Sequence, residues 1–309
     1  MLFCKGKNIF AVRNQKKFPL FIQFIVSMVI GIDLGGTNIR AGLINNGRII
    51  QIYQAPLSEK NSLESTLQQL YAGIGSFSNY DIEGIGIGVP SIVDTKKGIV
   101  YDVVNIPSWK KVELKKILEE KFNIPTYVNN DVNCLALGEQ LFGQAASFSS
   151  FVTIAIGTGL GASIIIDRKL YEGLNCGSGE IGYIPYLDKN LEFYASGTFF
   201  ETYSTTAHAA YHAALNNDAS ALQMWTSYGH HLGEVMKVIL YTYAPEAIII
   251  GGGLSNAFSF FESSMRQSMN DFIYPGLLKQ VRILPSSVKN MAILGAAALV
   301  YSNETTIAK

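Results

Sequence analysis

The chain of 309 residues is 48% hydrophobic and 16% charged, with equal numbers of acidic and basic residues. This composition is ordinary for a globular protein with room for two domains, and it argues against disorder. Because the formal net charge is zero, nothing favours nucleic acid or an acidic membrane surface as a partner, and we expect small-molecule chemistry.

Residues 1–27 are the unusual part of the chain. Basic residues precede an apolar run that starts at Phe18, in superficial imitation of a secretory signal. The run passes into the next motif without a cleavage pattern. We therefore favour an N-terminal extension that is disordered or lies upstream of a natural start at Met28, over a signal peptide.

The next segment predicts a β-hairpin. "VIGIDLGGTNIRAGLI", Val29 to Ile44, places Asp33 and two glycines between apolar runs, and a polar turn and a third strand follow. The pattern recurs in "FVTIAIGTGLGASIIIDRKLY", Phe151 to Tyr171. Two copies predict two similar domains that face each other.

Helices and buried strands are expected around the two copies. The cleft of such an α/β fold lies at the carboxyl ends of its strands. We predict helices over residues 62–77, 112–122, 195–215, 220–243 and 292–301, a strand over 82–91, a strand-to-helix junction at 129–131, and a strand from 245 that runs into three glycines and a helix capped near Ser255 or Asn256.

Three glycine-rich turns each follow an apolar strand, at residues 33–37, 157–159 and 251–253. Without a Cβ, backbone N–H groups can approach an anion closely. A single such turn is usually no more than a tight turn, but three in order favour nucleotide phosphates.

These motifs together resemble the ROK family of sugar kinases and regulators, within the actin, Hsp70 and sugar-kinase superfamily. The resemblance runs from Met28 to the C-terminus. "IGIDLGGTNIRAGLI" resembles the first phosphate motif, "VNNDVNCLALGE" the segment with the catalytic aspartate, "IGTGLGASIIIDRKLYEGLNCGSGEIGYI" the second phosphate motif and signature, "IIIGGGLSNA" the adenosine motif, and residues 86–109 part of the sugar cleft.

The resemblance implies two ribonuclease-H-like domains with an interdomain cleft, the actin-like ATPase fold. The small domain would comprise residues 28–130 and the C-terminal helix 291–309, and the large domain residues 131–290. The resemblance also implies a homodimer or homotetramer, for which the aromatic-rich segment Phe193 to Tyr211 offers an apolar patch.

The implied activity is ATP-dependent phosphorylation of a hexose hydroxyl, with Asp131 as general base. Such a transfer needs a hydroxyl in line with the phosphorus and a group that accepts its proton. Asp131 stands where a strand ends and a helix begins, and nearby N–H groups can stabilise its carboxylate there. The alternative is that Asp131 only caps the helix.

ATP and Mg²⁺ are the cofactors that the resemblance implies. Asp33 would face the Mg²⁺ of ATP through water, since Mg²⁺ keeps much of its hydration shell; the alternative is a hairpin aspartate with a local backbone bond. The implied ATP-binding residues are Asp33, Gly35, Gly36, Thr37, Gly157, Thr158, Gly159, Gly252, Gly253 and Leu254.

The sugar site is implied residue by residue, because amide and carboxylate groups can pair with vicinal hydroxyls. The weakest member is Glu201, whose surroundings differ from the family pattern. The implied set is Asn105, Asn130, Asp131, Glu180 and Glu201.

A structural zinc is not expected, although most relatives carry one. The family's zinc histidine is replaced by Tyr183, and "EFYASGTFFE", Glu192 to Glu201, has no cysteine. We expect Tyr194, Phe199 and Phe200 to order this loop by packing, and the tyrosine to affect sugar specificity.

Neither histidine pair is assigned to a site. His208 and His212 are four apart on an expected helix but lack a further ligand at useful spacing, and His230 and His231 point to different faces.

Two further classes of function remain as alternatives to a cytoplasmic kinase. They are a sugar-responsive transcriptional regulator and a non-catalytic sugar sensor. Family repressors carry a DNA-binding domain before the same fold, and the 27 residues before the first motif are too short for one. The cytoplasm is expected because Cys4, Cys134 and Cys176 are too few and too scattered for a disulfide framework.

Overall fold

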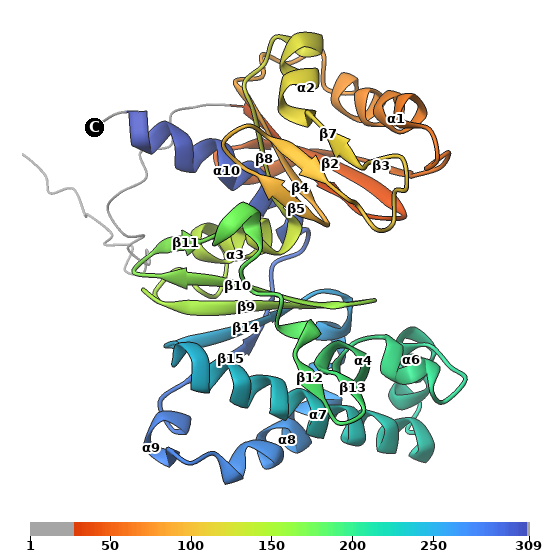
Figure 1. The fold of residues 1–309 in the computed structure, drawn as a ribbon, viewed down its shortest axis with the longest axis vertical. Helices are drawn as coiled ribbons and strands as arrows, with labels where there is room; N and C mark the ends of the chain where they lie inside the picture. The colour runs from red at the N-terminus through yellow and green to blue at the C-terminus, as the bar shows by residue number, and fades with distance from the viewer. Residues whose placement is uncertain (1–27, 308–309) are drawn as a thin grey trace, which may run out of the picture.

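The structure is a computed structural model that describes residues 28–307. The extension expected over residues 1–27 lies outside this range. Figure 1 shows two lobes, one above the other, with the earliest strands in the upper lobe and the strands and helices between residue 151 and the start of the C-terminal helix in the lower lobe. Within residues 28–307 no helix is both long and apolar enough to cross a membrane.

Both lobes are built on a five-stranded sheet with one topology. In each, an antiparallel three-stranded meander comes first, and its first strand is extended by two parallel strands. The first sheet has the order β3 (Arg48–Pro56), β2 (Asn38–Asn45), β1 (Met28–Leu34), β4 (Gly84–Val89) and β8 (Thr126–Asn130), and the second the order β11 (Lys169–Tyr171), β10 (Leu160–Ile166), β9 (Phe151–Ile156), β14 (Ala247–Gly251) and β15 (Arg282–Pro285). The two similar α/β halves predicted from the repeated hairpin are confirmed.

The C-terminal helix α10 (Met291–Ile307) packs directly on the first sheet, and Figure 1 shows it in blue beside the upper lobe. Glycines allow this approach. A Cβ on Gly31 would lie 2.1 Å from the Ile293 carbonyl oxygen, and one on Gly86 would lie 1.9 Å from that of Ala296. The alternation of isoleucine and glycine in β4 therefore buries the strand and brings the helix backbone onto it.

Helix α3 (Asp131–Phe142) packs against α10 and also against β9 and β10 of the second sheet. The two helices cross at glycines, since a Cβ on Gly295 would lie 1.9 Å from the Cys134 carbonyl oxygen. The crossing thus joins the lobes. We keep the division into residues 28–130 with 291–309 and residues 131–290 as a proposal.

Three predicted helices are α1 (Leu63–Gly75), α2 (Leu114–Phe122) and α7 (Ala219–Tyr243). The prediction of one long helix over residues 195–215 is wrong. Extended backbone at Ser196 and a φ of 56° at Ser204 interrupt it. The segment instead forms α4 (Leu191–Ala195), α5 (Thr198–Glu201) and α6 (Ala207–Leu215).

Ser255 and Asn256 lie near the N-cap of α8, as expected, since Ala257 is the N-cap, but their side chains do not cap the helix. Their side chains donate to the carbonyl oxygens of Gly252 and Gly253 inside a 3₁₀ turn, and no side chain caps the next helix. The remaining elements are α8 (Phe258–Ser268), α9 (Pro275–Leu278), β5 (Ile92–Asp94), β6 (Ile99–Tyr101), β7 (Lys111–Val112), β12 (Pro185–Tyr186) and β13 (Lys189–Asn190).

Candidate active site

A cavity of about 500 Å³ lies between the lobes. Residues of the first hairpin, the start of α3, the glycine turn after β14 and the segment before α10 line it. Four predicted site residues meet in it: Asp33, Asp131, Gly252 and Gly253. Ligand sites of α/β folds commonly occupy such a position at the ends of strands.

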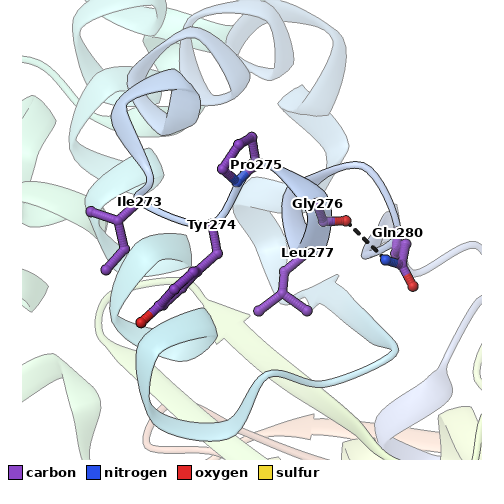
Figure 2. Close-up of a pocket in the computed structure, with 6 residues that line it drawn as sticks. All are labelled: Ile273, Tyr274, Pro275, Gly276, Leu277 and Gln280. Atoms are coloured by element: carbon purple, nitrogen blue, oxygen red, sulfur yellow. Dashed lines mark hydrogen bonds between the residues drawn. The ribbon is translucent and has the colours of Figure 1, made fainter.

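A second hollow lies beside α9, and Figure 2 shows the residues that line it. They come from one short stretch, residues 273–280, and include Ile273, Tyr274 and Leu277. None of the six lining residues is charged. Because phosphoryl transfer needs charged and proton-accepting groups, we place the candidate active site in the interlobe cavity.

At the β8–α3 junction, one residue caps the helix and the next is the catalytic candidate. Asn130 is the N-cap, since its side-chain oxygen accepts hydrogen bonds from the backbone N–H groups of Val132 (2.9 Å) and Asn133 (3.2 Å). The capping considered for Asp131 therefore belongs to its neighbour. Asp131 accepts one hydrogen bond from Val132 N, at 2.9 Å, and lines the cavity.

The acidity of Asp131 is changed by its surroundings. Burial in the cleft and the nearby Asp33 carboxylate raise its pKa to about 7, with a further contribution from Glu180. The backbone N–H of Val132 opposes this rise. A carboxyl group that titrates near neutral pH is well matched to accept a proton during a reaction.

The first glycine turn carries an ion pair that sequence reasoning missed. Arg40 on β2 stands opposite Asp33 on β1, and its guanidinium donates to the Asp33 carboxylate. Both side chains line the cavity. The hairpin register was the available signal, because the two residues flank the turn at equal distance.

Asn105 lies against the same turn. A Cβ on Gly36 would lie 2.5 Å from the Asn105 Cβ, so only glycine permits this contact. The Trp109 indole N–H donates to the Thr66 hydroxyl at 2.7 Å and anchors the loop that carries Asn105 to α1. The predicted sugar residue Asn105 is thus held beside the predicted phosphate turn, in which Thr37 is exposed.

The turns of the second lobe are open to solvent or to the cavity. Gly252 has a φ of 83°, and a Cβ there would lie 2.3 Å from the Ile156 carbonyl oxygen. Added Cβ atoms on Gly157 and Gly253 would meet nothing within 4 Å, which leaves room for a ligand. Thr158, Gly159 and Leu254 in these turns, and Gly35 in the turn of the first lobe, complete the predicted ATP-binding set, whose roles stay predictions.

Glu192 is a second residue that sequence reasoning missed. Its carboxylate accepts a hydrogen bond from Leu160 N at 2.8 Å, beside the Gly157–Gly159 turn. Partial burial and the Glu192 carboxylate raise the pKa of Glu180. The two residues are far from the turn in sequence, so no local pattern reveals the contact.

Two residues predicted to bind the sugar, Asn130 and Glu201, do not have side chains that lie free in the cavity. The Asn130 side chain is engaged at the helix cap and in a 3.3 Å hydrogen bond to the Ser91 carbonyl oxygen. Glu201 is exposed at the end of α5. The structure brings Glu192 to the side of Glu180, while sugar contacts by Asn130 and Glu201 stay predictions.

The positions that match the zinc ligands of relatives flank the β12–β13 hairpin: Tyr183 ends a 3₁₀ turn before it, and residues 192–201 form α4 and α5 after it. The Tyr186 hydroxyl lies 3.1 Å from His231 Nδ1, and the Tyr194 ring lies 4.9 Å from that imidazole. Tyr183 is 65% exposed. Aromatic contacts thus hold the hairpin on α7.

The aromatic residues of α5 face inward. Phe199 and Phe200 are buried in the core of the lower lobe. They do not contribute to the apolar patch expected over residues 193–211, and oligomerisation stays a prediction. His208 and His212 face each other on α6, with their Nε2 atoms 3.1 Å apart.

The cleft suits a nucleotide-borne Mg²⁺ better than a metal held by protein alone. In the described part of the chain, no three His, Cys, Asp or Glu side chains form a metal-binding group. The Asp33 carboxylate faces the cavity in addition to Asp131, and Mg²⁺ bound to phosphates needs little more than one carboxylate from the protein. The ion pair to Arg40 would have to open or be shared.

Two duplicated lobes with a cleft between them define the actin-like ATPase fold. The sequence matches the ROK family over residues 29–303, and the chain belongs to this family.

Its relatives include regulators and kinases. The xylose repressor of Bacillus spizizenii is 31% identical, over 91% of this chain and 78% of the repressor. The glucokinase of Halalkalibacterium halodurans is 27% identical, over 91% of this chain and 97% of that enzyme. The ROK family glucokinase of Streptomyces griseus, solved with glucose and AMPPNP, is 25% identical with a TM-score of 0.78, over 88% of this chain and 99% of that one.

Proposed function

We propose that the protein is an ATP-dependent sugar kinase that phosphorylates a hexose hydroxyl, with Asp131 as general base. The observation that carries the proposal is the Asp131 carboxyl group in the interlobe cavity, with its pKa raised to about 7. Asp33 and the glycine turn after β14 line the same cavity. Proton acceptor and phosphate-binding candidates therefore share one space.

The reaction assigns a task to each group. The sugar hydroxyl oxygen attacks the γ-phosphorus, the bond to the β–γ bridging oxygen breaks, and Asp131 takes the hydroxyl proton. Bound MgATP would supply the phosphoryl group, with Asp33 facing its metal through water. Asn105, Glu180 and Glu192 would orient the sugar hydroxyls.

A sugar-responsive regulator or non-catalytic sensor is the second candidate. The repressors among the relatives favour it. A sensor needs the sugar but no proton acceptor at the transferred hydroxyl. The perturbed carboxyl group of Asp131 beside the glycine turns favours the kinase.

A coupled ADP-release assay with MgATP and a panel of sugars tests the proposal. Glucose, fructose and N-acetylmannosamine are the first substrates to compare, with xylose added because of the repressor relatives. We expect at least one hexose to raise ADP release above the rate with ATP alone and to yield a sugar phosphate by mass. Sugar binding in calorimetry without ADP release from any sugar would favour the sensor.

A further inference from the structure

Asn129 is the centre of a buried polar network at the β8–α3 junction, two residues before Asp131. Its side chain is 4% exposed. Its side-chain oxygen Oδ1 accepts hydrogen bonds from Asn130 N (2.8 Å), Asn133 Nδ2 (3.0 Å) and Cys176 Sγ (3.1 Å). The orientation of this one amide thus fixes the backbone at the start of α3.

Glu172 sets that orientation from the other lobe. The Asn129 Nδ2 donates to Glu172 Oε1 at 2.7 Å, and the Thr95 hydroxyl donates to Glu172 Oε2 at 3.2 Å. Glu172 follows β11 of the second sheet, whereas Asn129 lies in β8 of the first sheet and Thr95 directly follows β5. One carboxylate therefore bridges the lobes beside the catalytic candidate.

The thiol of Cys176 extends the bridge along the same loop. Burial and the Glu172 carboxylate raise the pKa of Cys176 to about 12. The thiol stays protonated and can donate to Asn129. The loop that begins at Glu172 is thereby held at two points before it reaches Glu180.

We propose that Glu172 is a positioning residue that joins the junction carrying Asp131 to the loop leading to Glu180. The inference rests on the proposed kinase function. Glu172 acts through hydrogen bonds to Asn129 rather than by touching the substrate. Its loss leaves the Asn129 amide without the acceptor that orients it, and small displacements of a reacting group reduce rates strongly.

Two substitutions at one position separate positioning from general stability. Glu172→Ala removes both acceptors, and we expect kcat to fall about tenfold or more while KM for ATP changes little. Glu172→Gln keeps an acceptor for Asn129, and we expect it to restore kcat to within about threefold of wild type. Glu262→Ala, which removes an exposed ion pair with Arg266 on α8, is the matched control and should behave as wild type.

Hydrogen exchange of the backbone amides over residues 129–136 gives a readout independent of activity. We expect faster exchange in Glu172→Ala and near-native exchange in Glu172→Gln. If the alanine variant does not fold, Thr95→Val decides the matter, because it removes one of the two partners of Glu172 and should give a smaller loss of kcat in the same direction.

Wild-type kcat and exchange in Glu172→Ala would overturn the proposal, as would equal losses in the alanine and glutamine variants. A loss confined to KM for ATP would also overturn it. If the wild-type protein phosphorylates no sugar, the proposed function fails, and the exchange experiment still tests Glu172.

Discussion

The two lobes place different chemistry at the same position of the same hairpin. In the first lobe, Asp33 pairs in register with Arg40 on β2 and with a glycine of β4. In the second, Ala155 stands at the matching place, opposite Gly161 on β10 and a glycine of β14. Asp33, Arg40 and Ala155 all line the interlobe cavity.

The repeated hairpin therefore gives both sides of the cleft the same backbone shape. The different residues at the matching position give the two sides different charge. The end at the first lobe holds an ion pair, and the end at the second lobe holds a methyl group and glycine turns. We infer that the charged end faces the metal of a bound nucleotide and that the glycine turns of the uncharged end lie along the rest of the nucleotide.

The largest expected effect comes from Asp131, which lines the same cavity. Asp131→Asn should lower kcat by about 10²–10⁴, because the amide cannot accept the hydroxyl proton. Sugar and ATP affinities should stay close to wild type, since the amide is nearly isosteric. Steady-state kinetics together with calorimetric titration of both ligands measures the two effects separately.

The same variant distinguishes the base from a helix cap. Asn130 already caps α3, so the substitution should not lower the unfolding midpoint. At neutral pH and above it should raise the midpoint, because it removes a carboxylate whose ionised form is disfavoured by burial. Retention of more than about a tenth of wild-type kcat would reject Asp131 as the base.

Asp33→Asn removes the acidic group from the charged end of the cavity. Loss of this carboxylate should weaken the binding of ATP in the presence of Mg²⁺ by about 10–100-fold, as for other groups that act on a metal through an intervening ligand. Binding of ATP without Mg²⁺ should change little. Calorimetry with ATP at varied Mg²⁺ measures both. Asp167→Asn, in the exposed turn after β10 with a φ of 49° that asparagine also adopts, is the control. Equal behaviour of the two variants would remove the metal role from Asp33.

Two glycine substitutions test the backbone geometry of the turn after β14 in the second lobe. Gly252→Ala should cost about 1–3 kcal/mol of unfolding free energy, because of its positive φ and the close Ile156 carbonyl oxygen. Gly253→Ala should cost less than about 0.5 kcal/mol, since its Cβ would meet nothing within 4 Å. Urea denaturation compares them, and similar losses in both would contradict the geometry.

The smallest expected effect concerns zinc. The aromatic contacts of Tyr186 and Tyr194 with His231 hold the hairpin that follows Tyr183. We therefore expect elemental analysis to find no stoichiometric zinc and a chelator to leave the melting temperature unchanged. About one zinc per chain would refute this expectation.

The repeated hairpins and the β8–α3 junction were predictable because each depends on a local pattern of apolar residues and turn residues. The break of the 195–215 helix was not, since it depends on the burial of Phe199 and Phe200 against α7. The roles of Glu172 and Glu192 were equally hidden. Their partners Asn129 and Leu160 lie 43 and 32 residues away, and only the tertiary fold brings them together.

The most direct test of the account is the pH dependence of kcat/KM for the sugar, with both substrates well below saturation so that the free protein is reported. Protonated Asp131 cannot accept the hydroxyl proton, and its pKa is raised to about 7. The account predicts a plateau above this pH and a fall of about tenfold per pH unit below it. A rate that stays flat down to about pH 5 would contradict Asp131 as the general base.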